Sequence, residues 1–359
     1  MPVKIESPDA QNGLLEFITF ADRVRPELSA RWPAAIDMQL PMLMGLSAFM
    51  AGKPIRAFVA REGGEVVARV AAVLDPEYAQ RWGEKLGHLL FFEAAAGADG
   101  AARAVLDAGC EWLRGQGAVA ARSGFYLPLD MPFVIDEYDA LPPNMMRQNP
   151  DYYHSMIKDA GFFCEKGMVD YKIEVTPDLI ARYQSALEAA RRAGFELKTL
   201  AEIPQEKRAG EFGPAFNEAF YNHWGYVVSN QEAMTEMMIF VELMGGLDTS
   251  ICAYQRGQVV GTLMVVPEET AHAKLLPGRV IKDSEKLNFL GIGVREPARG
   301  RGLNIAMAAQ AYLTLIDRGA KYLSYTLVVD DNWPSRRTAE KLGAKVCANY
   351  VVYRRNFRA

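Results

Sequence analysis

A glycine-rich turn before a helix pattern is the stretch of this sequence that most clearly predicts chemistry. The turn and the first helical residues are Arg299, Gly300, Arg301, Gly302, Leu303 and Asn304. Such a turn exposes unpaired backbone N–H groups, which add to the positive end of the helix dipole. The two arginines contribute full charges, so the stretch predicts a cradle for an anion such as a pyrophosphate. Without its context, the same stretch would fit a basic surface loop at least as well.

The elements around this turn follow an order of strand and helix periods that occurs twice. The first half predicts a hairpin at 55–74, strands at 88–93 and 118–125, a helix at 101–115 and a last strand at 169–175. The second half predicts a hairpin at 250–266, strands at 287–294 and 322–329, helices at 303–318 and 333–342, and a last strand at 350–354. The sequence therefore predicts an α+β protein of two domains in tandem, each a mixed, mostly antiparallel sheet flanked by helices. We place the boundary before Pro177, which gives domains 1–176 and 177–359.

The second domain resembles the GNAT (N-acetyltransferase-like) superfamily over roughly Gly194–Arg355. The superfamily signature, Arg/Gln-x-x-Gly-x-Gly/Ala after the fourth strand, matches the turn that starts at Arg299. The superfamily also has an Asn after the fifth strand and Leu-Gly-Phe about ten residues later. Here Asn332 and Leu342-Gly343-Ala344 take these places. The resemblance implies an acyl-CoA thioester as co-substrate, with its pyrophosphate on the turn.

In this superfamily the fourth strand splays from the fifth at a bulge, and the thioester and pantetheine lie in the opening. The corresponding residues here are Gly291, Ile292, Gly293 and Val294. Glycines allow a ligand to approach the backbone closely, and N–H groups there would polarise the thioester carbonyl. Close packing of a helix would explain Gly291 equally well.

Three features depart from the superfamily pattern. Asn304 stands where Gly or Ala is usual, and Ala339 stands where many members carry the Tyr that protonates the leaving thiolate. Another group supplies that proton, the thiolate leaves unassisted, or activity has been lost. The first half has AAAGADGAAR (Ala94–Arg103) after its strand, which lacks the cradle pattern and carries an acidic residue. We therefore expect a degenerate first domain and one CoA site per chain.

The acceptor amine must be neutral to attack, so the resemblance also requires a base or a water relay. The candidates are Asp330, Asp331, Glu218 and His223. Strand parity groups Asp330 with Ser324 and Thr326 on one polar face, while Asp331 points the other way. A turn or helix cap would explain the two aspartates equally well, and a lone His is more often structural.

Within the superfamily, the chain resembles a bacterial tandem-GNAT group of the ceramide synthase type, which transfers a long acyl group to a sphingoid amine. The features that carry this resemblance are the turn from Gln148 to Tyr153, Asn217-Glu218-Ala219 with Trp224-Gly225, and Asp331-Asn332. Methionine-rich stretches at 34–50 and 237–244 would suit varied alkyl chains or a membrane surface, although core packing explains most of them as well. The alternatives are acetylation of a small polar amine, aminoacyl transfer from tRNA, and a non-catalytic acyl-CoA sensor.

The composition limits these options. A formal net charge of −4 argues against a nucleic-acid partner, and with it against charged tRNA. The four cysteines form no CxxC pair, so the sequence predicts neither a metal site nor a disulfide framework. The N-terminus shows no secretory pattern, and we expect a cytoplasmic protein with the option of peripheral contact at the inner membrane face. The sequence carries no signal for the oligomeric state.

Overall fold

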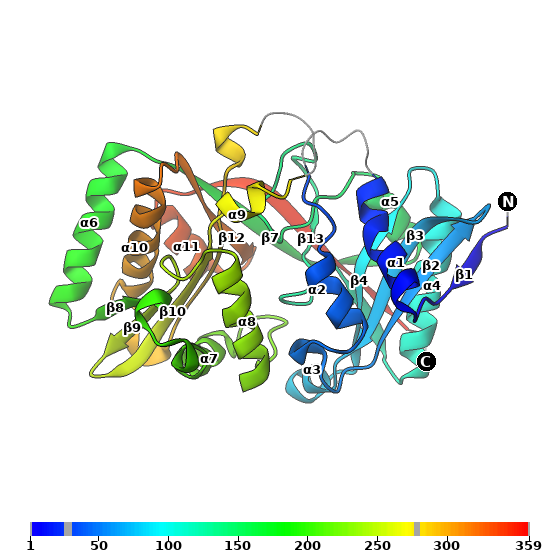
Figure 1. Ribbon diagram of the computed structural model, residues 1–359, viewed down its shortest axis with the longest axis horizontal. Helices are drawn as coiled ribbons and strands as arrows, with labels where there is room; N and C mark the ends of the chain where they lie inside the picture. Colours follow the sequence, from blue (N-terminus) through cyan, green and yellow to red (C-terminus); the bar gives the residue numbers. More distant parts are fainter. Residues whose placement is uncertain (1, 25–30, 276–280, 358–359) are drawn as a thin grey trace.

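The computed structural model describes residues 2–24, 31–275 and 281–357, and it forms two layered halves side by side (Figure 1). The strands of the first half are β1 (Lys4–Glu6), β2 (Ile55–Glu62), β3 (Glu65–Leu74), β4 (Leu86–Ala94), β5 (Ala120–Ser123), β6 (Phe133–Val134) and β7 (Phe163–Glu174). Its helices are α1 (Gln11–Val24), α2 (Ile36–Leu43), α3 (Pro76–Trp82), α4 (Asp99–Gly115) and α5 (Tyr153–Asp159).

The second half begins with a helix. Its helices are α6 (Pro177–Arg192), α7 (Gln205–Phe220), α8 (Gln231–Leu243), α9 (Glu269–His272), α10 (Leu303–Asp317) and α11 (Trp333–Lys341). Its strands are β8 (Glu196–Thr199), β9 (Ile251–Gln255), β10 (Gln258–Val266), β11 (Phe289–Val294), β12 (Tyr322–Val329) and β13 (Lys345–Asn356). Both hairpins and the helices around the glycine turn lie where the sequence predicts them.

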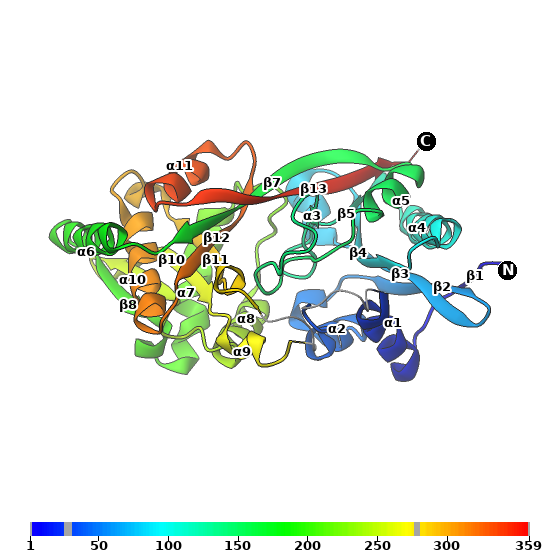
Figure 2. The same cartoon turned by 90° about the horizontal axis from the view of Figure 1, so that it is seen from above.

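The two sheets do not correspond to the two halves. Among the described residues, one sheet has the order β1-β2-β3-β4-β5-β13-β7-β12, with β6 paired to β13, and the other has the order β11-β10-β9-β8. The last strand of each half is therefore exchanged, since β13 pairs with β5 and β7 pairs with β12. β7 and β13 also pair with each other and run side by side across the molecule (Figure 2). The proposed boundary after residue 176 falls between β7 and α6, but the backbone ladders cross it.

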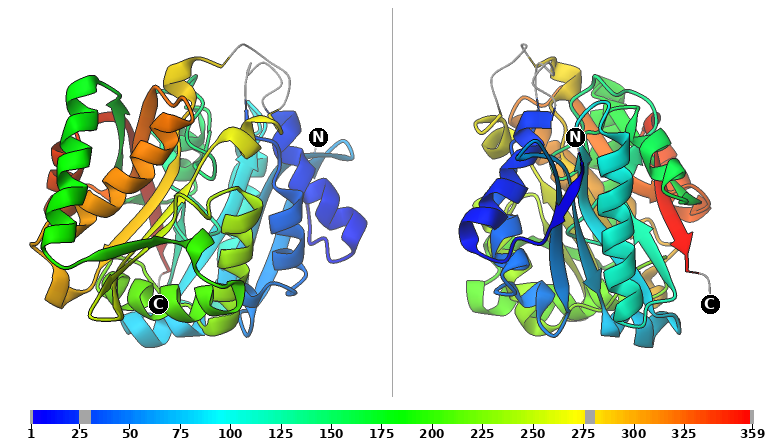
Figure 3. Two further views of the ribbon diagram at one scale, coloured as in Figure 1. Left: turned by 60° about the vertical axis from the view of Figure 1, so that its left-hand side comes forward. Right: turned by 90° about the vertical axis from the view of Figure 1, so that its right-hand side faces the viewer.

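Helices cover both faces of each half. In the first half, alternate residues of β3 face opposite layers: Arg69 donates to the Phe17 carbonyl of α1, while Val70 lies beside Gly109 of α4. The views in Figure 3 show the sheet between α1 and α4, and they show α6 and α10 packed together. In the second half, α10 covers one face of the four-stranded sheet at Gly261, and α7 covers the other at Gly293.

Most of the methionine-rich segment at 34–50 packs into the core. Met42 and Met50 are buried, and Met38 packs against the main cluster of the first half. Met44 and Leu46 remain exposed. No helix in the described ranges is long and apolar enough to cross a bilayer.

Candidate functional site

The edges of the two sheets meet in a wedge between β11 and β12. β11 ends the four-stranded sheet and β12 ends the larger one, and no backbone ladder joins them. Side chains close the narrow end. Asn288 exchanges hydrogen bonds with the Ser324 backbone (3.1 and 2.9 Å), and the Thr326 hydroxyl binds both the N–H and the carbonyl of Leu290 (2.8 and 3.0 Å). We call these side-chain hydrogen bonds the stitch, and beyond it residues of both strands line a cavity.

The wedge leaves backbone donors of β11 facing the gap. The Leu290 N–H points towards β12, where it meets Thr326. β11 keeps an uninterrupted antiparallel register with β10, so the N–H of Ile292, two residues further, points the same way. This N–H lies past the stitch and is available to a ligand.

The two predicted glycines of β11 have different roles. A Cβ at Gly293 would lie 2.7 Å from the Ala219 Cβ and 2.9 Å from the Phe220 ring, so α7 packs directly on this residue. A Cβ at Gly291 would find its nearest neighbour, the Met264 methyl, at 3.8 Å. Helix packing therefore explains Gly293, whereas Gly291 borders open space.

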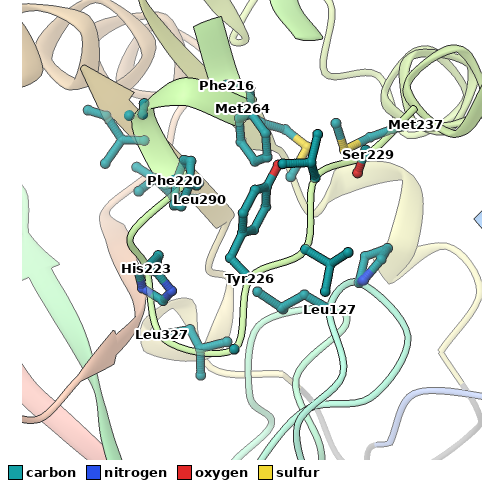
Figure 4. A pocket seen from close by; sticks show the side chains of 18 of the residues that line it. Leu127, Phe216, Phe220, His223, Tyr226, Ser229, Met237, Met264, Leu290 and Leu327 are labelled. Carbon is teal, nitrogen blue, oxygen red and sulfur yellow. The ribbon is translucent and has the colours of Figure 1, made fainter. Parts of the chain in front are cut away.

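The wedge opens into a cavity of about 440 Å³ between the two halves (Figure 4). Nine of the predicted CoA-binding residues line it, namely Gly291, Ile292, Gly293, Val294, Arg299, Gly300, Leu303, Asn304 and Asn332. Gly300 and Gly302 adopt positive φ angles of 75° and 77°, which lets the turn lead directly into α10 without a side-chain cap. The first turn of α10 and the wedge thus border one cavity.

The two arginines of the turn diverge. Arg299 lines the cavity, and its Nε donates to the Val294 carbonyl at 2.9 Å. Arg301 turns away, donates to Gln255 and to the Ala193 carbonyl, and stacks over the ring of Phe195. Spacing could not distinguish them, because both flank the same glycine.

A polar side chain in the first turn of α10 binds one in the second turn of α11. Asn304 Nδ2 donates to the Thr338 hydroxyl at 2.7 Å, and Asn304 Oδ1 accepts the N–H of Ile305. Asn332 caps α11 by accepting the Ser335 N–H at 3.3 Å. These bonds fix α11 against the start of α10.

Of the four predicted catalytic residues, only His223 lines the cavity. It lies between α7 and α8 on a segment that Asn217 holds through the Ser229 backbone and the Tyr226 hydroxyl (2.6 Å). His223 Nδ1 is 3.2 Å from the Trp224 carbonyl, which can only accept, so Nε2 keeps its lone pair. Burial lowers the pKa of His223 below its ordinary value, which keeps the ring neutral.

The three predicted carboxylates lie outside the cavity lining. Glu218 pairs with Arg295, whose hydrogen bonds lower the pKa of the carboxyl. Asp331 pairs with Lys166 at 2.7 Å, and the Asp330 carboxylate lies against Gly167 of β7.

The parity argument for Asp330 is wrong because β12 contains a bulge. Between Tyr325 and Val328 this strand has one residue more than its partner β7. Leu327 takes a positive φ of 55°, and its N–H donates to the Asp170 carboxylate at 2.5 Å. Alternation is therefore shifted by one residue after the bulge, and Asp330 no longer shares the face of Ser324 and Thr326.

Apart from the end of the methionine-rich stretch at 34–50, sequence reasoning missed the opposite wall of the cavity, which the first half supplies. Its apolar members are Phe49, Phe125, Leu127, Leu129, Met131 and Met145. The second half adds Phe216, Phe220, Met237, Met264 and Phe289. A small polar cluster lies among these apolar residues, in which Lys53 Nζ is 3.3 Å from a carboxylate oxygen of Asp75 and 3.3 Å from one of Glu77. No local motif marks these residues, since their shared surface arises only when the halves pack.

The corresponding wedge of the first half is filled by its own side chains. β4 pairs in parallel with β5 up to Leu89. Beyond that point, Asp130 accepts the Phe91 N–H, and Arg147 donates to the Phe92 carbonyl and pairs with Asp130. The backbone groups that a thioester would need are thus already bound.

This geometry, a splayed strand pair beside a glycine turn and a helix N-terminus, defines a GNAT-type domain. Residues 214–344 match the family described as Acetyltransferase (GNAT) family. The second half therefore has a GNAT-like fold over these residues, and members of that family use acetyl-CoA or another acyl-CoA as co-substrate. In the described part of the chain, no cluster of His, Cys, Asp and Glu could hold a metal ion.

Comparison with known proteins finds similarity over most of the chain. Protein YghO of Escherichia coli (strain K12) is 23% identical over 328 residues, which cover 83% of this chain and 81% of that protein. A tandem GNAT protein from the clavulanic acid biosynthesis pathway superposes with a TM-score of 0.59 at 14% identity, covering 99% of this chain and 98% of its own.

Two further structures share the fold. A GCN5-related N-acetyltransferase from Sphaerobacter thermophilus gives a TM-score of 0.54 at 16% identity, over 99% of this chain and 96% of that one. A fungal multi-domain GH3 β-N-acetylglucosaminidase with a GCN5-related glucosamine N-acetyltransferase region gives 0.59 at 18% identity. This chain is covered to 98% but spans only 38% of the fungal one. The fold is that of two GNAT-like domains in tandem.

Proposed function

We propose that this protein is an acyl-CoA-dependent N-acyltransferase with one CoA site, in the second half. The observation that carries the proposal is that the first turn of α10 and the free edge of β11 border one cavity. The pyrophosphate would bind the N–H groups from Gly300 to Asn304, with Arg299 beside them. Pantetheine would lie in the wedge past the Thr326 stitch. The filled wedge of the first half leaves no equivalent place.

The chemistry follows from the groups that face the gap. The Ile292 N–H would donate to the thioester oxygen as negative charge develops on it. His223 would accept the proton of the attacking amine through Nε2 or a water, since its ring is neutral. The amine nitrogen forms a bond to the acyl carbon, and the bond from that carbon to sulfur breaks.

The wall from the first half supports an acceptor or acyl group with a large apolar portion. Its aromatic, leucine and methionine side chains would bury an alkyl chain at about 25 cal/mol per Å². We therefore favour a long-chain amine of the sphingoid-base kind, acylated to a ceramide-type amide. Such an acceptor resides in membranes, so peripheral membrane contact belongs to the same proposal.

Binding and turnover test the proposal separately. Calorimetry with acetyl-CoA and palmitoyl-CoA should show one site per chain and tighter binding of palmitoyl-CoA. Arg299→Glu should weaken binding by roughly 10- to 100-fold, because a charged contact is worth about 1.5–3 kcal/mol. Arg301→Glu is the matched control, and it should bind nearly as wild type because Arg301 turns away.

Release of CoA thiol is then followed with sphinganine, glucosamine and an amino acid as acceptors. Turnover with sphinganine that rises with acyl length supports the lipid acceptor. Turnover with a small polar amine alone moves the function to acetylation of such amines. Binding without turnover on any amine indicates a sensor, and no binding of either thioester overturns the proposal.

A further inference from the structure

A hydroxyl pair on the cavity wall has no role in the steps above. The Tyr325 hydroxyl of β12 lies 3.0 Å from Ser335 Oγ of α11, and both residues line the cavity. The Tyr325 ring is buried edge-on against Tyr171, whereas Ser335 is partly exposed. The pair thus links a buried phenol to a hydroxyl with access to the cavity.

The pair borders the path that the proposed function assigns to pantetheine. Tyr325 directly precedes Thr326, which stitches the narrow end of the wedge. Ser335 lies one helical turn before Thr338, which binds Asn304 in the first turn of α10. One partner therefore belongs to the wedge and the other to the helix that faces the cradle.

The leaving thiolate needs a proton that no residue named so far supplies. Ala339 is fully buried, has no proton to give and does not line the cavity. His223, which lies on the segment between α7 and α8, is assigned to the amine. Tyr325 with Ser335 is a pair of O–H donors that links β12 of the wedge to α11.

Resting on the proposed N-acyl transfer, we propose that Ser335 and Tyr325 form a hydroxyl relay that protonates the CoA sulfur. As the bond between acyl carbon and sulfur breaks, the electron pair goes to sulfur and takes the Ser335 proton. Ser335 Oγ takes the Tyr325 proton in the same step. The amine loses one proton to His223, which passes it to solvent, and the phenolate regains one from solvent, so the protons balance.

The environment of Tyr325 keeps its hydroxyl protonated. Burial raises the pKa of Tyr325 to about 12, so the phenol keeps its proton at neutral pH. The bond to Ser335 acts against that rise. Arg336 binds the neighbouring Tyr171 hydroxyl at 2.9 Å and leaves the Tyr325 hydroxyl to Ser335.

The test uses Tyr325→Phe and Ser335→Ala in the full chain, with Tyr312→Phe as the matched control. Tyr312 is also a buried phenol, donating to the Ser324 carbonyl at 2.8 Å, but it does not line the cavity. We expect kcat with acyl-CoA to fall about 100-fold in the first two variants, with KM for acyl-CoA unchanged. The control should keep its kcat, and Ser335→Thr should restore turnover.

A second donor separates proton transfer from packing. The 4-nitrothiophenyl ester of the same acyl group releases a more acidic thiol, which leaves without protonation. With this ester, the ratio of each variant's kcat to that of wild type should therefore be close to one. An unchanged kcat in Tyr325→Phe, or an equal loss with both donors, overturns the relay. A wild-type protein inactive with every amine would instead refute the proposed function, which calorimetry and CoA release detect independently.

Discussion

Adding one methyl group to β11 should have opposite consequences at its two glycines. In Gly293→Ala the new Cβ would lie 2.7 Å from Ala219 and 2.9 Å from the Phe220 ring. Both residues belong to α7, so this helix would have to move away from β11. Overpacking of this kind costs about 1–3 kcal/mol. In Gly291→Ala the nearest atom is 3.8 Å away, so folding is not penalised. Replacing the glycine should even stabilise the strand by about 0.4–1 kcal/mol.

Binding should show the reverse order. The Gly291 methyl would project into the space that pantetheine is proposed to occupy, and the same overpacking scale predicts a loss of about 10- to 100-fold in acyl-CoA affinity. Urea unfolding measures the first effect, and calorimetry with acetyl-CoA measures the second. A Gly291→Ala protein that is as stable as wild type and binds the thioester equally well would refute the assignment of the wedge. A Gly293→Ala protein of unchanged stability would refute the packing account.

Three further predictions concern titrating groups. His223→Gln should lower kcat about 100-fold and remove the acid limb of the pH–rate profile, which should lie below pH 6.5 because burial lowers the pKa; a limb that persists in the variant excludes His223. Asp330→Asn and Asp331→Asn should leave turnover close to wild type, since neither residue lines the cavity, and a clear loss in either would restore it as a candidate base. Burial raises the pKa of Asp170 to about 7, so the folded state holds this proton more tightly and stability is lost as pH rises from about 4 to 7. Urea unfolding between pH 5 and 8 should therefore show the free energy of unfolding of Asp170→Asn rising relative to that of wild type as pH increases, by at most about 4 kcal/mol. Parallel curves of this free energy against pH would contradict the prediction.

Local patterns predict the glycine turn and the helix that follows it, because the residues that determine them are contiguous. The apolar strand, the glycine turn and the start of α10 follow one another in the chain, and each has a period or a residue type that marks it. The turn at Gly300 and Gly302 is predictable from the sequence because its positive φ angles favour glycine. The difference between Arg299 and Arg301 depends on Phe195 and Gln255, which lie far away in sequence.

The bulge in β12 was beyond sequence reasoning for the same reason. Nothing in the strand from Tyr322 to Val329 marks an irregularity, since it contains neither Gly nor Pro. The positive φ of Leu327 is held by Asp170, a carboxylate on β7 that is 157 positions away. Tyr350 of β13 supports the other carboxylate oxygen at 3.3 Å. Parity therefore failed at Asp330 through a contact that no local window contains.

The exchange of the last strands gives the first half a structural role in the site, although its own wedge is filled. Among the described residues, the backbone partner of β12 is β7, a strand that precedes α6. The wedge exists because β12 follows β7 away from β11, so the first half supplies the element that opens it. The same half provides the wall from Phe125 to Met131 across the cavity. Residues 177–359 alone would lack both, and for this reason we regard the proposed acyl-transfer site as a property of the whole chain rather than of its second domain.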